Sequence, residues 1–109
     1  MATIQRQNTP AISGIQQVEE SDISYLRWAT DEFTTYSVRY GLSPGTYTVE
    51  RIGSLYDKLH WLDIMDMEPG MTYYVQITAD DRSDNRAVSP EFTAQRATTR
   101  YLYLPTVRK

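Results

Sequence analysis

Residues 72–79 read Thr-Tyr-Tyr-Val-Gln-Ile-Thr-Ala, and this stretch decides the fold class. Apolar residues occupy every second position from Tyr73 to Ala79, and more polar residues lie between them. Because successive side chains of a strand point to opposite faces, the apolar set would share one face. Pro69 and Gly70 before the stretch and the polar run 80–85 after it are turn signals. The pattern predicts a half-buried β-strand between two turns.

The same alternation recurs on both sides of this strand. Strands are predicted at residues 24–29, 36–40, 46–52 and 58–64, with an edge strand near Ile12 and a last strand near Phe92. Turns are predicted at the acidic run 19–22, at residues 30–32 and at Ser43-Pro44-Gly45. Apolar residues nowhere recur at helical spacing over three turns. The chain is therefore predicted to be all-β, a two-sheet antiparallel β-sandwich of about seven strands.

Length and composition place limits on organisation and partners. A chain of 109 residues suits one domain, which we assign to residues 10–97, with an N-terminal linker at 1–9 and a C-terminal tail at 98–109. The net charge of −3 argues against nucleic acid as a partner. No apolar stretch approaches the roughly 20 residues that span a bilayer, so membrane insertion is not expected. Without cysteine there is no disulfide and no thiolate metal site.

Several positions together resemble the fibronectin type III domain. They are Pro10, Ile12, Leu26, Trp28, Val38, Tyr40, Leu62, Ile64, Met67, Pro69, Gly70 and Tyr73. The most specific part is Met67-Glu68-Pro69-Gly70-Met71-Thr72-Tyr73, which looks like the family's turn into its sixth strand, with Met67 in place of the usual Leu. The resemblance implies that Tyr73 bonds through its hydroxyl to the backbone near residues 67–69. The expected structural core is Trp28, Val38, Tyr40, Leu62, Met67, Pro69, Tyr73 and Val75.

A second resemblance concerns His60, Leu62 and Ile64 before the turn, and Ala79 and Asp80 after the strand. These positions are similar to bacterial fibronectin type III domains and to the accessory domain of purple acid phosphatases. That similarity implies a non-catalytic module of a larger secreted or cell-surface protein, whose export signal would belong to a longer parent chain. A spacer or a protein-interaction and adhesion module is expected first. The alternative is a carbohydrate-binding or accessory domain of an extracellular hydrolase such as a phosphatase.

Candidate metal ligands are few, and none forms a convincing site. His60 and Asp63 would point to opposite faces of a strand, which separates His60 from Asp63 and Asp66. The acidic residues of the 80–85 run could supply oxygen ligands for calcium, but the glycine and distal Glu of an EF-hand loop are missing. The chain has no cysteine nucleophile and no glycine-rich phosphate loop. We therefore expect no metal, no cofactor and no catalytic residues.

A binding surface is the better-supported hypothesis. Tyr25, Arg27 and Trp61 should project from the outer face of one sheet, and Arg39 and Tyr74 from the outer face of the other. Exposed aromatic side chains beside Arg are common contact residues for protein or polysaccharide ligands. The alternative is that these aromatic residues only pair across their own sheet, in a passive spacer that links neighbouring domains of the parent chain. A contiguous apolar patch around Trp61 or Tyr74 would favour binding.

The tail ends with an alternating segment, Tyr101-Leu102-Tyr103-Leu104, followed by Pro105 and a basic end. Such a segment is adhesive if its backbone is unpaired. We expect residues 101–104 to extend the last strand or to pair with an exposed sheet edge. The tail is also similar to short basic endings of exported bacterial proteins, which implies a sorting role as the alternative.

Overall fold

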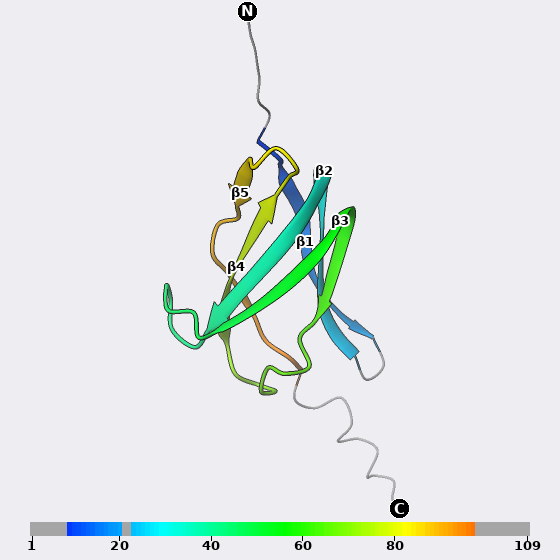
Figure 1. Cartoon of the computed structure of the whole chain (residues 1–109). Coiled ribbons are helices and arrows are strands. Elements are labelled where there is room, and N and C mark those ends of the chain that lie inside the picture. The colour runs from blue at the N-terminus through cyan, green and yellow to red at the C-terminus, as the bar shows by residue number, and fades with distance from the viewer. Residues whose placement is uncertain (1–8, 21–22, 98–109) are drawn as a thin grey trace, which may run out of the picture.

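The computed structural model describes residues 9–20 and 23–97, and this part of the chain contains six strands and no helix (Figure 1). The strands are β1 (Ile12–Glu20), β2 (Ile23–Gly41), β3 (Val49–Asp63), β4 (Tyr73–Asp80), β5 (Arg86–Val88) and β6 (Phe92–Ala94). Every strand pairing is antiparallel. The predicted all-β class is confirmed. No helix long and apolar enough to cross a membrane occurs in the described ranges.

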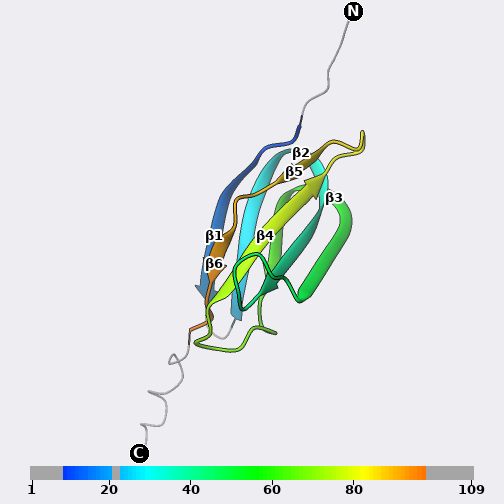
Figure 2. The same cartoon turned by 90° about the vertical axis from the view of Figure 1, so that its left-hand side faces the viewer.

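The two longest strands, β2 and β3, each contribute to both halves of the sheet. The first part of β2 pairs with β1 and with the last part of β3, where Arg27 lies opposite Trp61. The second part of β2 pairs with the first part of β3 and with β4, which also pairs with β5 and β6. The register of β2 against β3 shifts between Ala29 and Thr34. The sheet curls at this shift, so its two halves enclose one core (Figure 2).

The strand count differs from the prediction of about seven. The predicted strands 24–29 and 36–40 are one continuous strand, β2, and the predicted turn at 30–32 lies inside it. Two of its polar side chains form hydrogen bonds without breaking the strand. The Thr30 hydroxyl donates to the Glu32 carbonyl at 2.8 Å, and Asp31 Oδ1 accepts from the Ala11 amide at 2.8 Å. The predicted strands 46–52 and 58–64 are likewise joined in β3. Of the turn predicted at 19–22, Glu19 and Glu20 belong to β1, and residues 21–22 lie outside the described residues.

The apolar face predicted from alternation is the buried face. The core contains Leu26, Trp28, Val38, Tyr40, Leu62, Ile64, Met67, Val75, Ile77 and Ala94. Tyr73 is partly buried and packs against this cluster, with its ring 5.9 Å from the ring of Tyr40 in an edge-to-face arrangement. Pro69 was expected in the core, and that prediction is wrong because Pro69 is exposed. It lies in the turn before β4, where its ring fixes the backbone rather than filling the interior.

The predicted backbone contact of Tyr73 is present. The Glu68 backbone amide donates a hydrogen bond to the Tyr73 hydroxyl at 2.9 Å. The contact ties the start of β4 to the turn that connects it to β3. The predicted linker, apart from Thr9, and the predicted tail at 98–109 lie outside the described residues.

Candidate functional site

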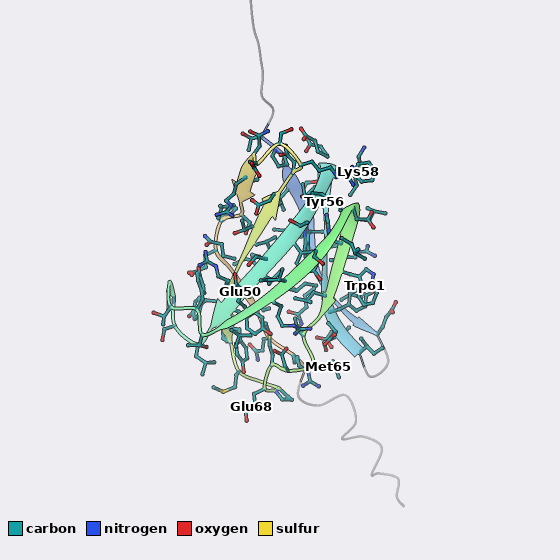
Figure 3. All side chains as sticks on the ribbon, viewed as in Figure 1. Glu50, Tyr56, Lys58, Trp61, Met65 and Glu68 are labelled. Carbon is teal, nitrogen blue, oxygen red and sulfur yellow. The ribbon has the colours of Figure 1, made fainter. Side chains whose placement is uncertain are left out.

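The first set of predicted binding residues gathers on one surface, the outer face of β1, β2 and the last part of β3. Tyr25 and Arg27 are successive outward positions of β2, and Trp61 is the register partner of Arg27 on β3. The rings of Tyr25 and Trp61 contact edge to face, with centroids 6.0 Å apart and planes at 67°. Figure 3 shows Trp61 on β3, above Met65. The structure therefore brings these three residues together.

This face contains a hollow of about 630 Å³, which we call the Trp61 hollow. It is lined by Gly14, Gln16, Ile23, Tyr25, Arg27, Trp28, Ala29, Leu59, His60 and Trp61. Three of its large apolar side chains are strongly exposed, with 66% for Trp61, 75% for Leu59 and 51% for Ile23. Grouped apolar side chains of this size on a water-facing surface are typical of contact sites, because they gain free energy when a partner covers them.

Arg27 supplies the only formal positive charge among the lining residues of the Trp61 hollow. Its Nε donates to the Gln16 side-chain oxygen at 2.9 Å, which fixes the guanidinium between β1 and β2. The hollow is thus an apolar surface with one oriented cation. Such an arrangement can pack aliphatic and aromatic side chains and bind one carboxylate or carbonyl oxygen.

The hollow also adjoins an unpaired sheet edge. In the described part of the chain, β3 pairs with β2 alone, so the other side of this 15-residue strand forms an edge. Edge strands present backbone amides and carbonyls that can pair with another extended segment. Leu59 and Trp61 therefore offer both outward side chains and an adjacent backbone edge.

The second set of predicted binding residues lies on the other half of the sheet, separate from the Trp61 hollow. Arg39 is exposed on β2, and its guanidinium stacks over the ring of Tyr47 at 5.5 Å. Its Nη2 also donates to the Gln76 side-chain oxygen at 3.5 Å. Tyr74 is half-buried and lies opposite Thr93 of β6. Arg39 thus already has partners within its own domain, so this face is the weaker candidate.

The structure separates the residues once considered as metal ligands. His60 is buried against Trp28, with ring centroids 5.4 Å apart, and its Nε2 lies 3.1 Å from the Thr30 hydroxyl. Burial lowers the pKa of His60 below its ordinary value. Asp63 and Asp66 lie elsewhere, and both pair with Arg51. No group of three His, Cys, Asp or Glu side chains in the described ranges is arranged to hold a metal ion.

Arg51 and Asp66 belong to a polar cluster with a structural role. The buried Tyr40 hydroxyl donates to the Asp66 carboxylate, and Arg51 Nη1 lies 3.2 Å from the same carboxylate. Burial, with a contribution from Asp66, raises the pKa of Tyr40 to about 12. Tyr40 therefore stays protonated at neutral pH. The cluster ties the loop after β3 to the middle of the sheet.

The polar loop between β4 and β5 is organised by Asp81 rather than left open for calcium. Asp81 Oδ1 accepts hydrogen bonds from the backbone amides of Ser83 and Asn85, at 2.8 and 2.9 Å. These bonds lower the pKa of the Asp81 carboxyl, with the Asn85 amide as the largest cause. Asp80 pairs with Arg86 at 2.7 Å. Asp80 and Asp81 therefore stabilise the tight turn between β4 and β5.

Sequence reasoning missed Ile23 and Leu59 as members of the candidate surface. Alternation does place Leu59 on the outer face with Trp61, so that signal was available in residues 58–64. Ile23 could not be found in this way, because its position depends on how β2 begins after the short connection from β1. The hollow itself forms because β1, β2 and β3 curl together, and no local sequence pattern predicts it.

The class of protein defined by these observations is an all-β antiparallel domain with an exposed apolar surface. No protein-family model matches the sequence, and no curated protein matches it. One solved structure is similar in fold: the crystal structure of pectate lyase PelI from Erwinia chrysanthemi in complex with tetragalacturonic acid. The TM-score is 0.54 and the identity 18%, over 80% of this chain and 28% of that chain. The chain thus spans less than a third of the lyase, and the likeness concerns the fold alone.

Proposed function

We propose that this chain is a non-catalytic interaction module with a fibronectin type III-like sandwich fold, and that it binds an extended segment of a partner protein. The observation that carries the proposal is the Trp61 hollow beside the free edge of β3. A partner strand paired with that edge would place alternate side chains over Leu59 and Trp61. Backbone pairing would supply affinity, and the hollow would supply specificity.

The finer fold assignment is supported by the strand pairing. One layer would consist of β1, the first part of β2 and the last part of β3. The other would consist of the first part of β3, the second part of β2, β4, and the short β5 and β6. The hydrogen bond from Glu68 to Tyr73 is the corner contact expected of such sandwiches. In this description the two halves of β2 belong to different layers, as do the two halves of β3, so each half counts as a separate strand.

The chemistry of the hollow favours protein over polysaccharide. Sugar rings commonly stack on aromatic faces, but the Tyr25 and Trp61 planes meet at 67° and cannot form one flat platform. Leu59 and Ile23 add aliphatic surface, which suits apolar side chains better than hydroxyl-rich sugars. Carbohydrate binding is the second candidate, favoured by the exposed indole of Trp61 beside Arg27. A secreted or cell-surface location and neighbouring domains of a parent chain remain part of the proposal.

The test is a selection of displayed random peptides against the full chain, with hydrogen exchange of the bound complex as the readout. The expected result is a set of peptides rich in apolar residues that slow exchange of the β3 amides around Leu59 and Trp61. Calorimetric titration with tetragalacturonic acid tests the second candidate, and we expect no heat of binding. If the chain is only a passive spacer, the selection should recover no binding peptide and the titration should show no heat of binding. Peptides that protect other strands instead would contradict the assignment of the surface.

A further inference from the structure

The charge of Arg27 restricts which segments can cover the Trp61 hollow. We propose that the partner segment carries a Glu or Asp side chain beside its apolar side chains, and that Arg27 binds this carboxylate. The inference rests on the proposed function and adds the chemistry of the partner. Three observations support it: the contacts of Arg27, the distribution of the acidic residues, and the cost of covering Arg27.

Arg27 differs from the other cations of the domain in its contacts. The described part of the chain contains seven Lys and Arg side chains. Six of them are held by a carboxylate, a backbone carbonyl or an aromatic ring: Arg39, Arg51, Lys58, Arg82, Arg86 and Arg96. Within the described ranges, Arg27 has no ion pair and no aromatic ring contact, and its Nε bonds to the neutral side chain of Gln16. Because only Nε is used there, the two Nη groups can bind a pair of incoming oxygens.

The acidic residues of the domain lie away from the hollow. The described part of the chain carries thirteen Asp and Glu side chains, and none of them lines the hollow. Two acidic residues lie by register toward one end of it. Asp63 is opposite Tyr25, and Glu20 is opposite Ile23. An acidic side chain of a partner is therefore repelled by that end and attracted at Arg27, which favours one position of the segment.

Covering the hollow would remove Arg27 from water. A guanidinium that is buried without a counter-charge is strongly unfavourable, and the exposed side chains beside it, Leu59 and Trp61, have no oxygen to offer. A purely apolar segment would leave the charge unpaired, and a basic segment would add repulsion. A carboxylate avoids both costs, because its two oxygens match the geometry of the guanidinium. The hollow thus selects against neutral and basic segments as well as for acidic ones.

The register of the sheet predicts where the acidic residue lies in the segment. Arg27 is opposite Trp61, and Ala29 is opposite Leu59. Ala29 and Gly14 are the two smallest lining residues, so a bulky apolar side chain of the partner has room above them. Neighbouring side chains on one face of an extended segment are two residues apart, so we expect the acid two positions from a large apolar residue. Since β3 extends past Trp61 in both directions, a paired segment continues there, and we assign the carboxylate to a side chain rather than to a chain end.

The test is a selection from three matched libraries of displayed random peptides, whose central residue is fixed as Glu, Gln or Lys, against the full chain. A selected peptide is then synthesised with an amidated C-terminus, together with its Glu→Gln form. The dissociation constants of both peptides are measured for the wild type, Arg27→Gln and the control Arg82→Gln. Arg82 is a matched control, because the same charge is removed from the loop between β4 and β5, outside the hollow. Guanidinium unfolding of each variant shows whether it is folded.

The expected result is that most binders come from the Glu library and carry a large apolar residue two positions from the Glu. Arg27→Gln and the Glu→Gln peptide should each weaken binding about tenfold. Their combination should weaken it little further, because both changes remove the same contact. Arg82→Gln should change the affinity less than about twofold.

Three outcomes would contradict the inference. Equal yields from the three libraries, or equal affinities of Arg27→Gln and the wild type, would overturn it and leave the proposed function in place. Binding that is lost when the C-terminus is amidated would overturn the assignment to a side chain. If no library yields a binder, the proposed function and this inference both fail.

Discussion

The corner contact of Tyr73 permits a quantitative prediction. Tyr73→Phe removes the hydroxyl that accepts the Glu68 amide at 2.9 Å but keeps the ring that packs edge to face on Tyr40. The change therefore isolates one hydrogen bond. A typical intramolecular hydrogen bond contributes about 0.5–1.5 kcal/mol net. The contact lies in an exposed turn, so water can replace the lost acceptor, and the full penalty of a buried unsatisfied donor does not apply. We expect a loss of about 1 kcal/mol.

The assay is guanidinium unfolding followed by tryptophan fluorescence, in which the buried Trp28 should show the larger change on exposure to water. The matched control is Tyr74→Phe, which removes a hydroxyl from the opposite side of the same strand and should change stability by less than about 0.5 kcal/mol. A loss of about 1 kcal/mol in a domain of this size lowers the melting temperature by roughly 4–8 °C. Equal stability of the two variants would refute the view that the Tyr73 hydroxyl supports the turn. A changed denaturant slope would show that the variant altered more than one contact.

Three further predictions concern pH, packing and metal. Burial lowers the pKa of His60 below its ordinary value of 6.5, so the unfolded state binds the proton more tightly. The contribution of neutral His60 to the free energy of unfolding should therefore be fully present above pH 6.5 and should decrease as the pH falls below that value. Unfolding measurements at pH 7 and pH 5 test this. In the His60→Gln variant, most of the difference in stability between the two pH values should disappear. In Gly41→Ala the new Cβ would lie 2.1 Å from the Thr46 carbonyl oxygen, so unfolding measurements should show a loss of about 1–3 kcal/mol. Excess chelator should leave the melting temperature unchanged, and a clear decrease would revive the 80–85 loop as a calcium site.

Much of the fold was readable from local alternation, because β2, β4 and the end of β3 each bury one face. The outward Trp61 and the inward His60 illustrate this, since adjacent positions of β3 differ completely in exposure. Pro69 shows the limit of a resemblance, because a motif position can shape a turn without entering the core. The joining of the two predicted strands at residues 30–32 was not readable, since polar residues such as Thr30 indicate a turn unless tertiary contacts satisfy them. Here the Thr30 hydroxyl lies 3.1 Å from Nε2 of His60 on β3.

The candidate surface was readable only in part. Alternation places Tyr25, Arg27 and Trp61 on an outer face, but their meeting depends on which strands become neighbours. Arg27 and Trp61 are register partners although they are far apart in the sequence. The hollow and the free β3 edge follow from this pairing and from the curl of the sheet, which no local pattern encodes.

The most direct test of the central claim is the affinity of a selected peptide for Trp61→Ala compared with Ile52→Ala. Ile52 is a matched control, because it is 70% exposed on the same strand but does not line the hollow. If the Trp61 hollow is the contact surface, Trp61→Ala should weaken binding by about 2 kcal/mol, roughly thirtyfold, and Ile52→Ala should have little effect. Equal affinities for the two variants would contradict the claim that this face binds the partner.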